Sequence, residues 1–410
     1  TQEEIQINMS EEFFGNEDGL VGYWKFNAGA DAIAYDHSGN ANHGDINGAS
    51  WVVALTYVPD DNFEQALIDL GYDDVLDDSV MTANISSVTN LDVGEREISD
   101  LTGIAGFTAL TNLSCDQNQL TSLDVSGNTA LTYLYCRDNA LTSLDVSNNT
   151  ALTTLHCYRN QLTALDVSNN TALTTLNCYG SSSTSTYGVT NQITALDVSN
   201  NTALTSLQCG YNQLTTLDVS NNTALTTLSC AYNPLTTLDV SNNTALTNLT
   251  CYYNQLNTLD VSNNTALTYL YCSYNPLITL DVSNNTALTS LYVHSNALTT
   301  FDVSNNISLQ NFGAANNYFT AFDVSLNTAL TSLQLQGNDL TALDVSNNTA
   351  LTQLYVNSND LTALDVSNNT ALIYLYVGSN DLTTFDVSNN IALTYLYVHG
   401  NDLTVLDVSN

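Results

Sequence analysis

The segment from residue 109 to residue 410 repeats one 21-residue unit. One copy is Ala203-Leu-Thr-Ser-Leu-Gln-Cys-Gly-Tyr-Asn-Gln-Leu-Thr-Thr-Leu-Asp-Val-Ser-Asn-Asn-Thr223, and fourteen such copies follow one another. Inside each copy the pattern Leu-x-x-Leu-x-apolar-x-x-Asn occurs twice, at offsets of 10 and 11 residues. Repetition at this period predicts a solenoid, because one such unit cannot bury its apolar face without neighbouring copies.

A coil of 21 residues is too short for a substantial helix. We therefore predict an all-β solenoid with two strand-like segments per coil, joined by tight turns. Alternate residues of a strand face opposite sides, so the apolar positions of both segments are expected to point inward. In the copy above these positions are Leu204, Leu207, Cys209, Leu214, Leu217 and Val219. At roughly 4.8 Å per coil, the stack is expected to form a rod about 65 Å long.

The eight cysteines occupy one position of the repeat. They are Cys115, Cys136, Cys157, Cys178, Cys209, Cys230, Cys251 and Cys272. An even number of cysteines in an exported protein ordinarily suggests disulfides, and a cysteine row could also hold metal. Later copies carry Val293, Ala314 or Leu335 at the same position. Replacement by aliphatic residues favours a structural core row of small buried hydrophobic side chains.

Two rows of asparagine lie where each coil must turn. Examples are Asn212, Asn233, Asn254 and Asn275 in one row, and Asn222, Asn243, Asn264 and Asn285 in the other. Asparagine tolerates left-handed backbone and bonds backbone groups through its side chain. We interpret both rows as hydrogen-bonded ladders inside the turns.

This repeat resembles that of bacterial leucine-rich-repeat surface proteins, particularly the short 21-residue class with nested Leu-x-x-Leu repeats, and more distantly the internalins. The resemblance covers residues 109–410 fully and the preceding region loosely. It implies a secreted or cell-surface protein that supplies a binding surface, with ligands that vary with the exposed positions.

The region before the repeats divides into three segments. Residues 1–12 have the composition of an acidic tail. Residues 13–54 contain Gly22-Tyr-Trp-Lys-Phe-Asn27 and Asn42-His-Gly44, and resemble the start of a laminin-G-like, concanavalin-type β domain. Residues 55–108 combine degenerate repeats with a short amphipathic helix, which the helical spacing of Phe63, Ala66, Leu67 and Leu70 predicts. Such a helix suits a cap on the first coil.

The composition excludes several classes of function. A formal charge of −37, with only 4 Lys and Arg, excludes binding to nucleic acid through the phosphate backbone. The sequence contains no run of 18 apolar residues, so it predicts no transmembrane helix. The five histidines are scattered, and neither a Ser-His-Asp order nor a Gly-rich phosphate loop accompanies them, so we expect no enzymatic activity.

One aspartate of every copy should point to solvent, because it lies between two inward residues. These aspartates, the Asp row, are Asp124, Asp145, Asp166, Asp197, Asp218, Asp239, Asp260, Asp281, Asp302, Asp323, Asp344, Asp365, Asp386 and Asp407. Neighbours about 5 Å apart repel by roughly 0.8 kcal/mol in water. Hydroxyl groups, backbone donors, raised pKa values or bound cations would compensate, and Ca²⁺ is one candidate, for example at Asp218, Asp239, Asp260, Asp281 and Asp302.

Tyrosines form further solvent-facing rows. The candidates for ligand binding are Tyr211, Tyr232, Tyr253, Tyr274, Tyr355, Tyr374, Tyr376, Tyr395 and Tyr397. Rows of tyrosine can stack sugars or anchor a protein partner, and they also stabilise sheets through neighbouring-strand contacts. An insertion at 180–190, rich in Ser and Thr, lengthens one copy and is expected to loop outward.

These observations predict a non-enzymatic extracellular adhesion or recognition protein that presents a rigid solenoid surface to a protein or glycan. The alternative is a structural subunit that assembles end to end into a filament, with cations as a stabilising factor. It is suggested by the ending at Asp407-Val-Ser-Asn410, inside a repeat and without a polar capping unit.

Overall fold

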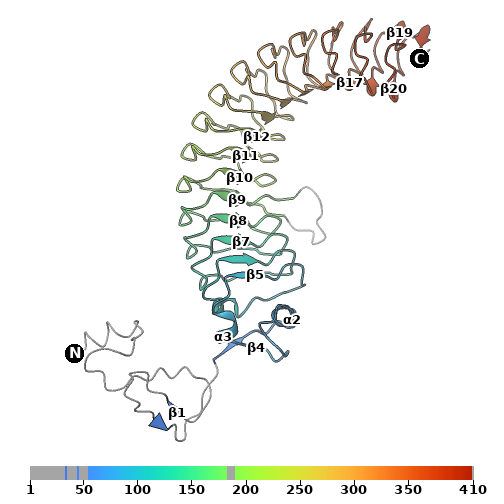
Figure 1. Cartoon of the computed structure of the whole chain (residues 1–410). Coiled ribbons are helices and arrows are strands. Elements are labelled where there is room, and N and C mark those ends of the chain that lie inside the picture. The colour runs from blue at the N-terminus through green and yellow to red at the C-terminus, as the bar shows by residue number, and fades with distance from the viewer. Residues whose placement is uncertain (1–32, 35–43, 46–53, 182–189, 409–410) are drawn as a thin grey trace.

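The computed structural model describes residues 33–34, 44–45, 54–181 and 190–408. The repeats wind into a solenoid whose main feature is one parallel sheet of 15 strands, with consecutive coils as neighbours. The predicted all-β solenoid is therefore confirmed. Figure 1 shows that the expected rod of stacked coils curves along its length.

Each coil contributes one three-residue strand to this sheet. The strands are β5 (Asn90–Asp92), β6 (Asn112–Ser114), β7 (Tyr133–Tyr135), β8 (Thr154–His156), β9 (Thr175–Asn177), β10 (Ser206–Gln208), β11 (Thr227–Ser229), β12 (Asn248–Thr250), β13 (Tyr269–Tyr271), β14 (Ser290–Tyr292), β15 (Asn311–Gly313), β16 (Ser332–Gln334), β17 (Gln353–Tyr355), β18 (Tyr374–Tyr376) and β20 (Tyr395–Tyr397).

The register of the sheet repeats from coil to coil. The central residue of each strand pairs with the central residue of the next, as Leu207 does with Leu228. These central residues are fully buried along most of the stack, while the residues on either side face outward. In the coil where the core row holds Ala314, the neighbouring core positions carry Phe312 and Phe319, both buried. Larger side chains there fill the volume that a smaller residue leaves, as close packing requires.

The second segment of each coil pairs differently from the first. Among the residues described, β-ladder pairing between second segments occurs at only two places. One is the bridge between Asp124 and Asp145, and the other is the pair β19 (Thr384–Asp386) and β21 (Val405–Asp407). In a typical coil, one backbone hydrogen bond joins the second segment to that of the preceding coil, from Gln213 N to Ile193 O. The next amide, that of Leu214, donates instead to the side-chain Oδ1 of Asn233 in the following coil. The asparagine oxygen takes the place of a backbone carbonyl, so the ladder does not continue. At the C-terminal end of Figure 1, β17 and β20 lie on the inner side of the curve and β19 on the outer side.

Both asparagine rows form the expected hydrogen-bonded ladders. Asn212 donates through Nδ2 to the carbonyls of Cys178 and Cys209, and its Oδ1 accepts from the amide of Ile193. In the other row, Asn222 donates to the carbonyls of Val198 and Asn201, each at 2.9–3.0 Å. Each buried amide therefore ties its own coil to the preceding one.

A short helix packs at the start of the solenoid, as its apolar spacing predicts. Helix α2 spans Asp61–Asp69 and buries Phe63, Ala66 and Leu67. Asp60 caps it by accepting from the amides of Asn62 and Phe63, and its second oxygen accepts from Ser99 and Asp100. The cap residue thus fixes α2 to the first, degenerate coil.

The other small elements complete this end of the chain. They are β3 (Leu55–Tyr57), which pairs antiparallel with β4 (Ser79–Met81), α3 (Thr82–Ile85), a 3₁₀ turn at Ile104–Gly106, and the antiparallel pair β1 (Ile33–Ala34) and β2 (Gly44–Asp45). The acidic tail at 1–12 and most of the laminin-G-like segment at 13–54 lie outside the described residues.

Candidate binding surface on the strands and turns

The outward residues of each strand and of the turn that follows it form one continuous surface along the solenoid, which we call the strand-and-turn face. In the coil of β10 it comprises residues 206 to 213. Several predicted tyrosines lie here, while the Asp row lies on the second segment of each coil. The sheet places equivalent residues of consecutive coils side by side, so any side chain repeated on this face forms a row.

Four tyrosines of the strand-and-turn face stack on one another. This Tyr stack consists of Tyr211, Tyr232, Tyr253 and Tyr274, one per coil. The ring centroids are 4.0, 4.3 and 4.0 Å apart, and the planes are within 24° of parallel. Tyr179 lies against the first ring at 4.8 Å, next to the point where the insertion begins. Each ring pair contributes about 0.5–1.5 kcal/mol beyond its area burial.

The backbone of the Tyr stack is left-handed. The four tyrosines have φ between 52° and 55°, a conformation in which the Cβ of a bulky residue crowds the backbone. Elsewhere the same turn position carries residues better suited to it, including Asn316, Gly337 and Gly400. A non-glycine residue held there costs on the order of 1–3 kcal/mol. Four consecutive coils therefore carry tyrosine against the local backbone preference.

Stacking decides which atoms the Tyr stack presents to solvent. A ring with a neighbour on each side, such as Tyr232 or Tyr253, has both faces covered and offers only its edge and hydroxyl group. Burial, followed by contacts with the neighbouring tyrosine hydroxyls, holds the pKa of Tyr232 above its ordinary value. Sugar stacking requires a free ring face, so this geometry does not favour it at the middle of the stack.

The remaining predicted tyrosines lie on the last strands of the sheet. Tyr355, Tyr376 and Tyr397 form one row, with centroids 4.9 and 5.5 Å apart. Tyr374 and Tyr395 form a second row, stacked at 4.7 Å with planes 3° apart. The structure therefore separates the nine predicted tyrosines into the Tyr stack in the turns and two shorter rows on the strands.

Every carboxylate of the Asp row is exposed, as expected. Asp218 accepts from the amide of Ser220 at 2.9 Å, and equivalent bonds occur from Asp124 through Asp386. The serine hydroxyl and amide together lower the pKa of most of these aspartates, including Asp218, Asp239 and Asp260. Raised pKa values were one possible compensation for the repulsion along the Asp row. That expectation is wrong for these residues, because the hydrogen-bond donors stabilise the charged form of each carboxylate.

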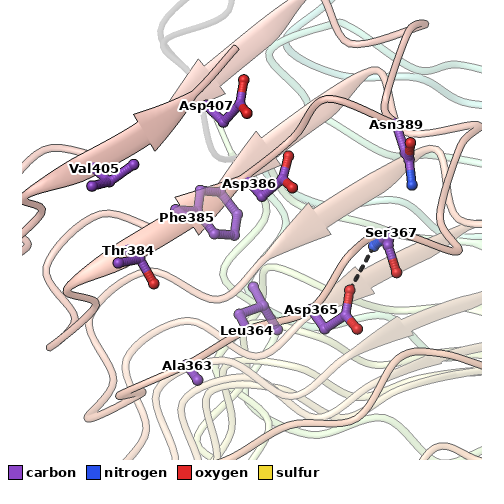
Figure 2. Close-up of a pocket in the computed structure, with 10 residues that line it drawn as sticks. All are labelled: Ala363, Leu364, Asp365, Ser367, Thr384, Phe385, Asp386, Asn389, Val405 and Asp407. Carbon is purple, nitrogen blue, oxygen red and sulfur yellow. Dashed lines mark hydrogen bonds between the residues drawn. The ribbon is translucent and has the colours of Figure 1, made fainter. Parts of the chain in front are cut away.

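A shallow hollow opens beside the Asp row near its C-terminal end. It has a volume of about 420 Å³ and is lined by Leu364, Asp365, Phe385, Asp386 and Asp407 together with nearby Thr and Ser. Figure 2 shows the three carboxylates following one another across adjacent coils, with Asp365 bonded to the amide of Ser367. Within the described part of the chain, no group of three or more His, Cys, Asp or Glu gathers to hold a metal ion. Calcium binding by Asp218, Asp239, Asp260, Asp281 and Asp302 stays a prediction.

The cysteine row lies inside the solenoid, away from this surface. All eight thiols are free and fully buried. Burial raises the pKa of the Cys230 thiol to about 12, so the reactive thiolate is suppressed.

Sequence reasoning did not single out a charged cluster at the N-terminal end of the strand-and-turn face. Arg137 lies 2.8 Å from Asp116, and both Arg137 and Arg159 lie 3.4 Å from Asp138. The two guanidinium groups are 5.6 and 5.7 Å from the ring of Tyr158. The spacing of these residues in the sequence could have revealed the cluster. They occupy the same or adjacent positions of consecutive repeats, and such positions become neighbours in a solenoid.

No helix in the described ranges combines the length and apolar character needed to cross a membrane. A family model described as the LVIVD repeat matches residues 119–160, 374–394 and 391–410. Internalin J of Listeria monocytogenes is 41% identical over 70 residues, which is 17% of this chain and 8% of that protein.

Solved structures give longer matches. The functional domain of InlJ from Listeria monocytogenes, described as including a cysteine ladder, is 40% identical with a TM-score of 0.78. That match covers 83% of this chain and 74% of that domain. A leucine-rich-repeat protein of Leptospira interrogans has a TM-score of 0.67 at 22% identity, covering 79% of this chain and 93% of that one, and shows likeness of fold alone.

Proposed function

The chain belongs to the internalin-like leucine-rich-repeat proteins, and from this premise we propose that it is an extracellular adhesion and recognition protein whose Tyr stack docks a protein partner. A repeat solenoid of this type suits a protein-binding scaffold, because it presents one extended surface. In this role the protein lies on the outer surface of a bacterial cell and meets its partner through the strand-and-turn face.

The observation that carries the proposal is the left-handed backbone of the Tyr stack. Tyrosine is an unfavourable choice at these turns, and the same position elsewhere in the chain mostly holds smaller residues such as Asn316, Ser358 and Gly337, besides Gln117 and Arg159. Ring stacking offsets part of the cost, but it does not explain why four consecutive coils avoid asparagine and glycine. A surface role does explain it, because tyrosine anchors protein interfaces through a rigid apolar ring and a polar hydroxyl group.

The chemistry around the Tyr stack supports a protein partner over a glycan. The stacked rings present edges and hydroxyl groups, which suit hydrogen bonds to backbone and side chains, and cover the faces that a sugar would need. The surrounding strand-and-turn residues in these coils are uncharged, including Gln213, Gln255 and Pro276. Interface centres are likewise depleted in charged residues and enriched in tyrosine.

A double variant, Tyr232→Asn with Tyr253→Asn, tests the proposal. Asparagine accepts left-handed backbone, so the variant is expected to fold as well as the parent protein. The labelled proteins would be applied to arrays of extracellular proteins and of glycans. We expect the parent chain to bind a protein on the array and the double variant to bind it at least about tenfold more weakly, as interfacial tyrosines do on truncation.

A matched control makes the same chemical change elsewhere. Tyr133 and Tyr318 are exposed and lie outside the Tyr stack. The Tyr133→Asn, Tyr318→Asn variant should therefore retain binding. Equal binding by the parent and the Tyr232→Asn, Tyr253→Asn variant, or binding to glycans alone, would refute the proposed site.

A further inference from the structure

Tyr253 and Tyr274 are the most closely aligned pair of the Tyr stack. Their ring centroids are 4.0 Å apart and the ring planes differ by 7°, against 24° and 16° for the other two pairs. Both residues have left-handed backbone, with φ of 52° and 55°, and they occupy the same position of consecutive coils. Their side chains therefore leave the backbone in the same direction and lie in register.

The hydroxyl groups of this pair also meet. Burial, followed by a hydrogen bond with the hydroxyl of Tyr274, raises the pKa of Tyr253. A bond between the hydroxyl groups of two parallel rings fixes how the rings overlap. The Cε carbons, which lie beside each hydroxyl group, are therefore brought against those of the other ring.

Both rings are open to solvent, since Tyr253 is 40% exposed and Tyr274 is 38% exposed. The other two members of the stack, Tyr211 and Tyr232, are half-buried. Cys251 lies two residues before Tyr253, but it is fully buried, and burial raises the pKa of its thiol well above the ordinary value. Thiol oxidation follows thiolate character and exposure, so an oxidant in solution reaches these phenols before the cysteine row.

We propose that Tyr253 and Tyr274 form a site of oxidative modification, at which a peroxidase and hydrogen peroxide join the two rings into a dityrosine. The inference goes beyond the proposed function and does not depend on it, because the link forms within one chain.

The reaction removes two hydrogen atoms from the pair. Each phenol loses one electron and its hydroxyl proton, which leaves two phenoxyl radicals whose unpaired electrons are shared with the Cε carbons. The radicals combine to form one Cε–Cε bond. The hydrogen on each bonded Cε then moves to the oxygen as a proton, which restores both aromatic rings and both hydroxyl groups. Hydrogen peroxide takes up the two electrons and two protons and becomes two water molecules.

Face-to-face stacking prepares this pair for the new bond. The unpaired electron at Cε occupies a π orbital whose lobes point along the ring normal, so a parallel ring at 4.0 Å meets it directly. Tyr355 and Tyr376 are placed less favourably, because their rings are half-buried, 4.9 Å apart and tilted by 25°. The link joins residues 21 positions apart in the sequence and constrains the unfolded chain, as a disulfide does.

Treatment of the dilute protein with a peroxidase and hydrogen peroxide tests the proposal, with the monomer isolated under denaturing conditions after the reaction. The monomer would be examined for the blue fluorescence of dityrosine. Cleavage before aspartate releases residues 239–259 and 260–280 as separate peptides. We expect these two peptides to be joined, with the loss of two hydrogen atoms, and their fragmentation spectrum to place the link at Tyr253 and Tyr274.

A pair of phenylalanine variants makes the test specific. Tyr253→Phe with Tyr274→Phe keeps both rings and removes both hydroxyl groups, so the turns stay filled. This variant should lose most of the dityrosine of the monomer. The matched control, Tyr355→Phe with Tyr376→Phe, should keep it.

Several results would overturn the proposal. The parent chain would yield only cross-linked dimers or no dityrosine, or the link would lie at other tyrosines. An equal yield from the parent chain and the Tyr253→Phe, Tyr274→Phe variant, or an equal loss in the control, would also exclude the assigned pair.

Discussion

Replacing His294 by asparagine is expected to remove a large part of the loss of stability that the protein undergoes between pH 7 and pH 5. His294 follows β14 and is largely buried, and burial lowers its pKa from 6.5 to about 4. Its Nδ1 accepts from the amide of Ala315 at 3.0 Å. Gly313 makes room for the ring, since a Cβ there would come within 2.4 Å of two imidazole atoms. The site therefore holds a neutral imidazole.

The sign and size of the effect follow from this pKa. Below pH 6.5 the unfolded chain binds a proton at this residue and the folded chain does not, so stability falls as the pH drops toward 4. The full difference corresponds to about 3 kcal/mol, of which about 2 kcal/mol is already lost at pH 5. The Asp row contributes little in this interval. Its lowered pKa values place its loss of stability below the unfolded carboxylate pKa of 3.8.

Urea unfolding followed by circular dichroism would measure the free energy of unfolding at pH 7 and pH 5. Coils of a solenoid are coupled to their neighbours, so a local cost in the coil of β14 should appear in the whole transition. The pH dependence of His294→Asn should be about 2 kcal/mol smaller than that of the parent protein. Gln336→Asn, at the same repeat position, should leave it unchanged. If the parent protein and the His294→Asn variant lost the same free energy of unfolding between pH 7 and pH 5, the reasoning would be refuted.

Four further measurements address the core, the cations and assembly. Asn222→Ala should lower the free energy of unfolding by about 1–3 kcal/mol, because the buried carbonyls of Val198 and Asn201 each lose one of two donors and keep only a backbone amide. Cys209→Val should cost less than about 1.5 kcal/mol and Cys209→Ser about 1–3 kcal/mol, and a thiol reagent should react with the parent protein only as it unfolds. If Ca²⁺ binds the Asp row, a chelator should lower the melting temperature beyond the effect of matched ionic strength, and an unchanged temperature removes that role. Electron microscopy checks end-to-end assembly: regular fibres would support a filament, and isolated short solenoids would contradict it.

The sequence by itself determined which residues face inward and where each coil turns. The 21-residue period, the alternation around Leu207 and the replacement of cysteine by Val293 or Ala314 follow from the covalent geometry of strands and from side-chain size. The asparagine ladders were predictable for the same reason, since a turn needs left-handed backbone and local donors. Helix α2 was visible in the spacing of Phe63, Ala66 and Leu67.

Only the tertiary structure decided how neighbouring coils meet at the surface. Whether the rings of Tyr232 and Tyr253 stack face to face depends on rotamers chosen against residues 21 positions away, and local pattern carries no information on them. The lowered pKa of Asp218 depends on the direction of the Ser220 amide, which the folded turn sets. The sparse pairing of the second segment arises because Asn233 supplies an acceptor to the adjacent coil. Inward and outward positions are properties of one chain segment, whereas stacking, proton affinity and pairing are properties of two segments in contact.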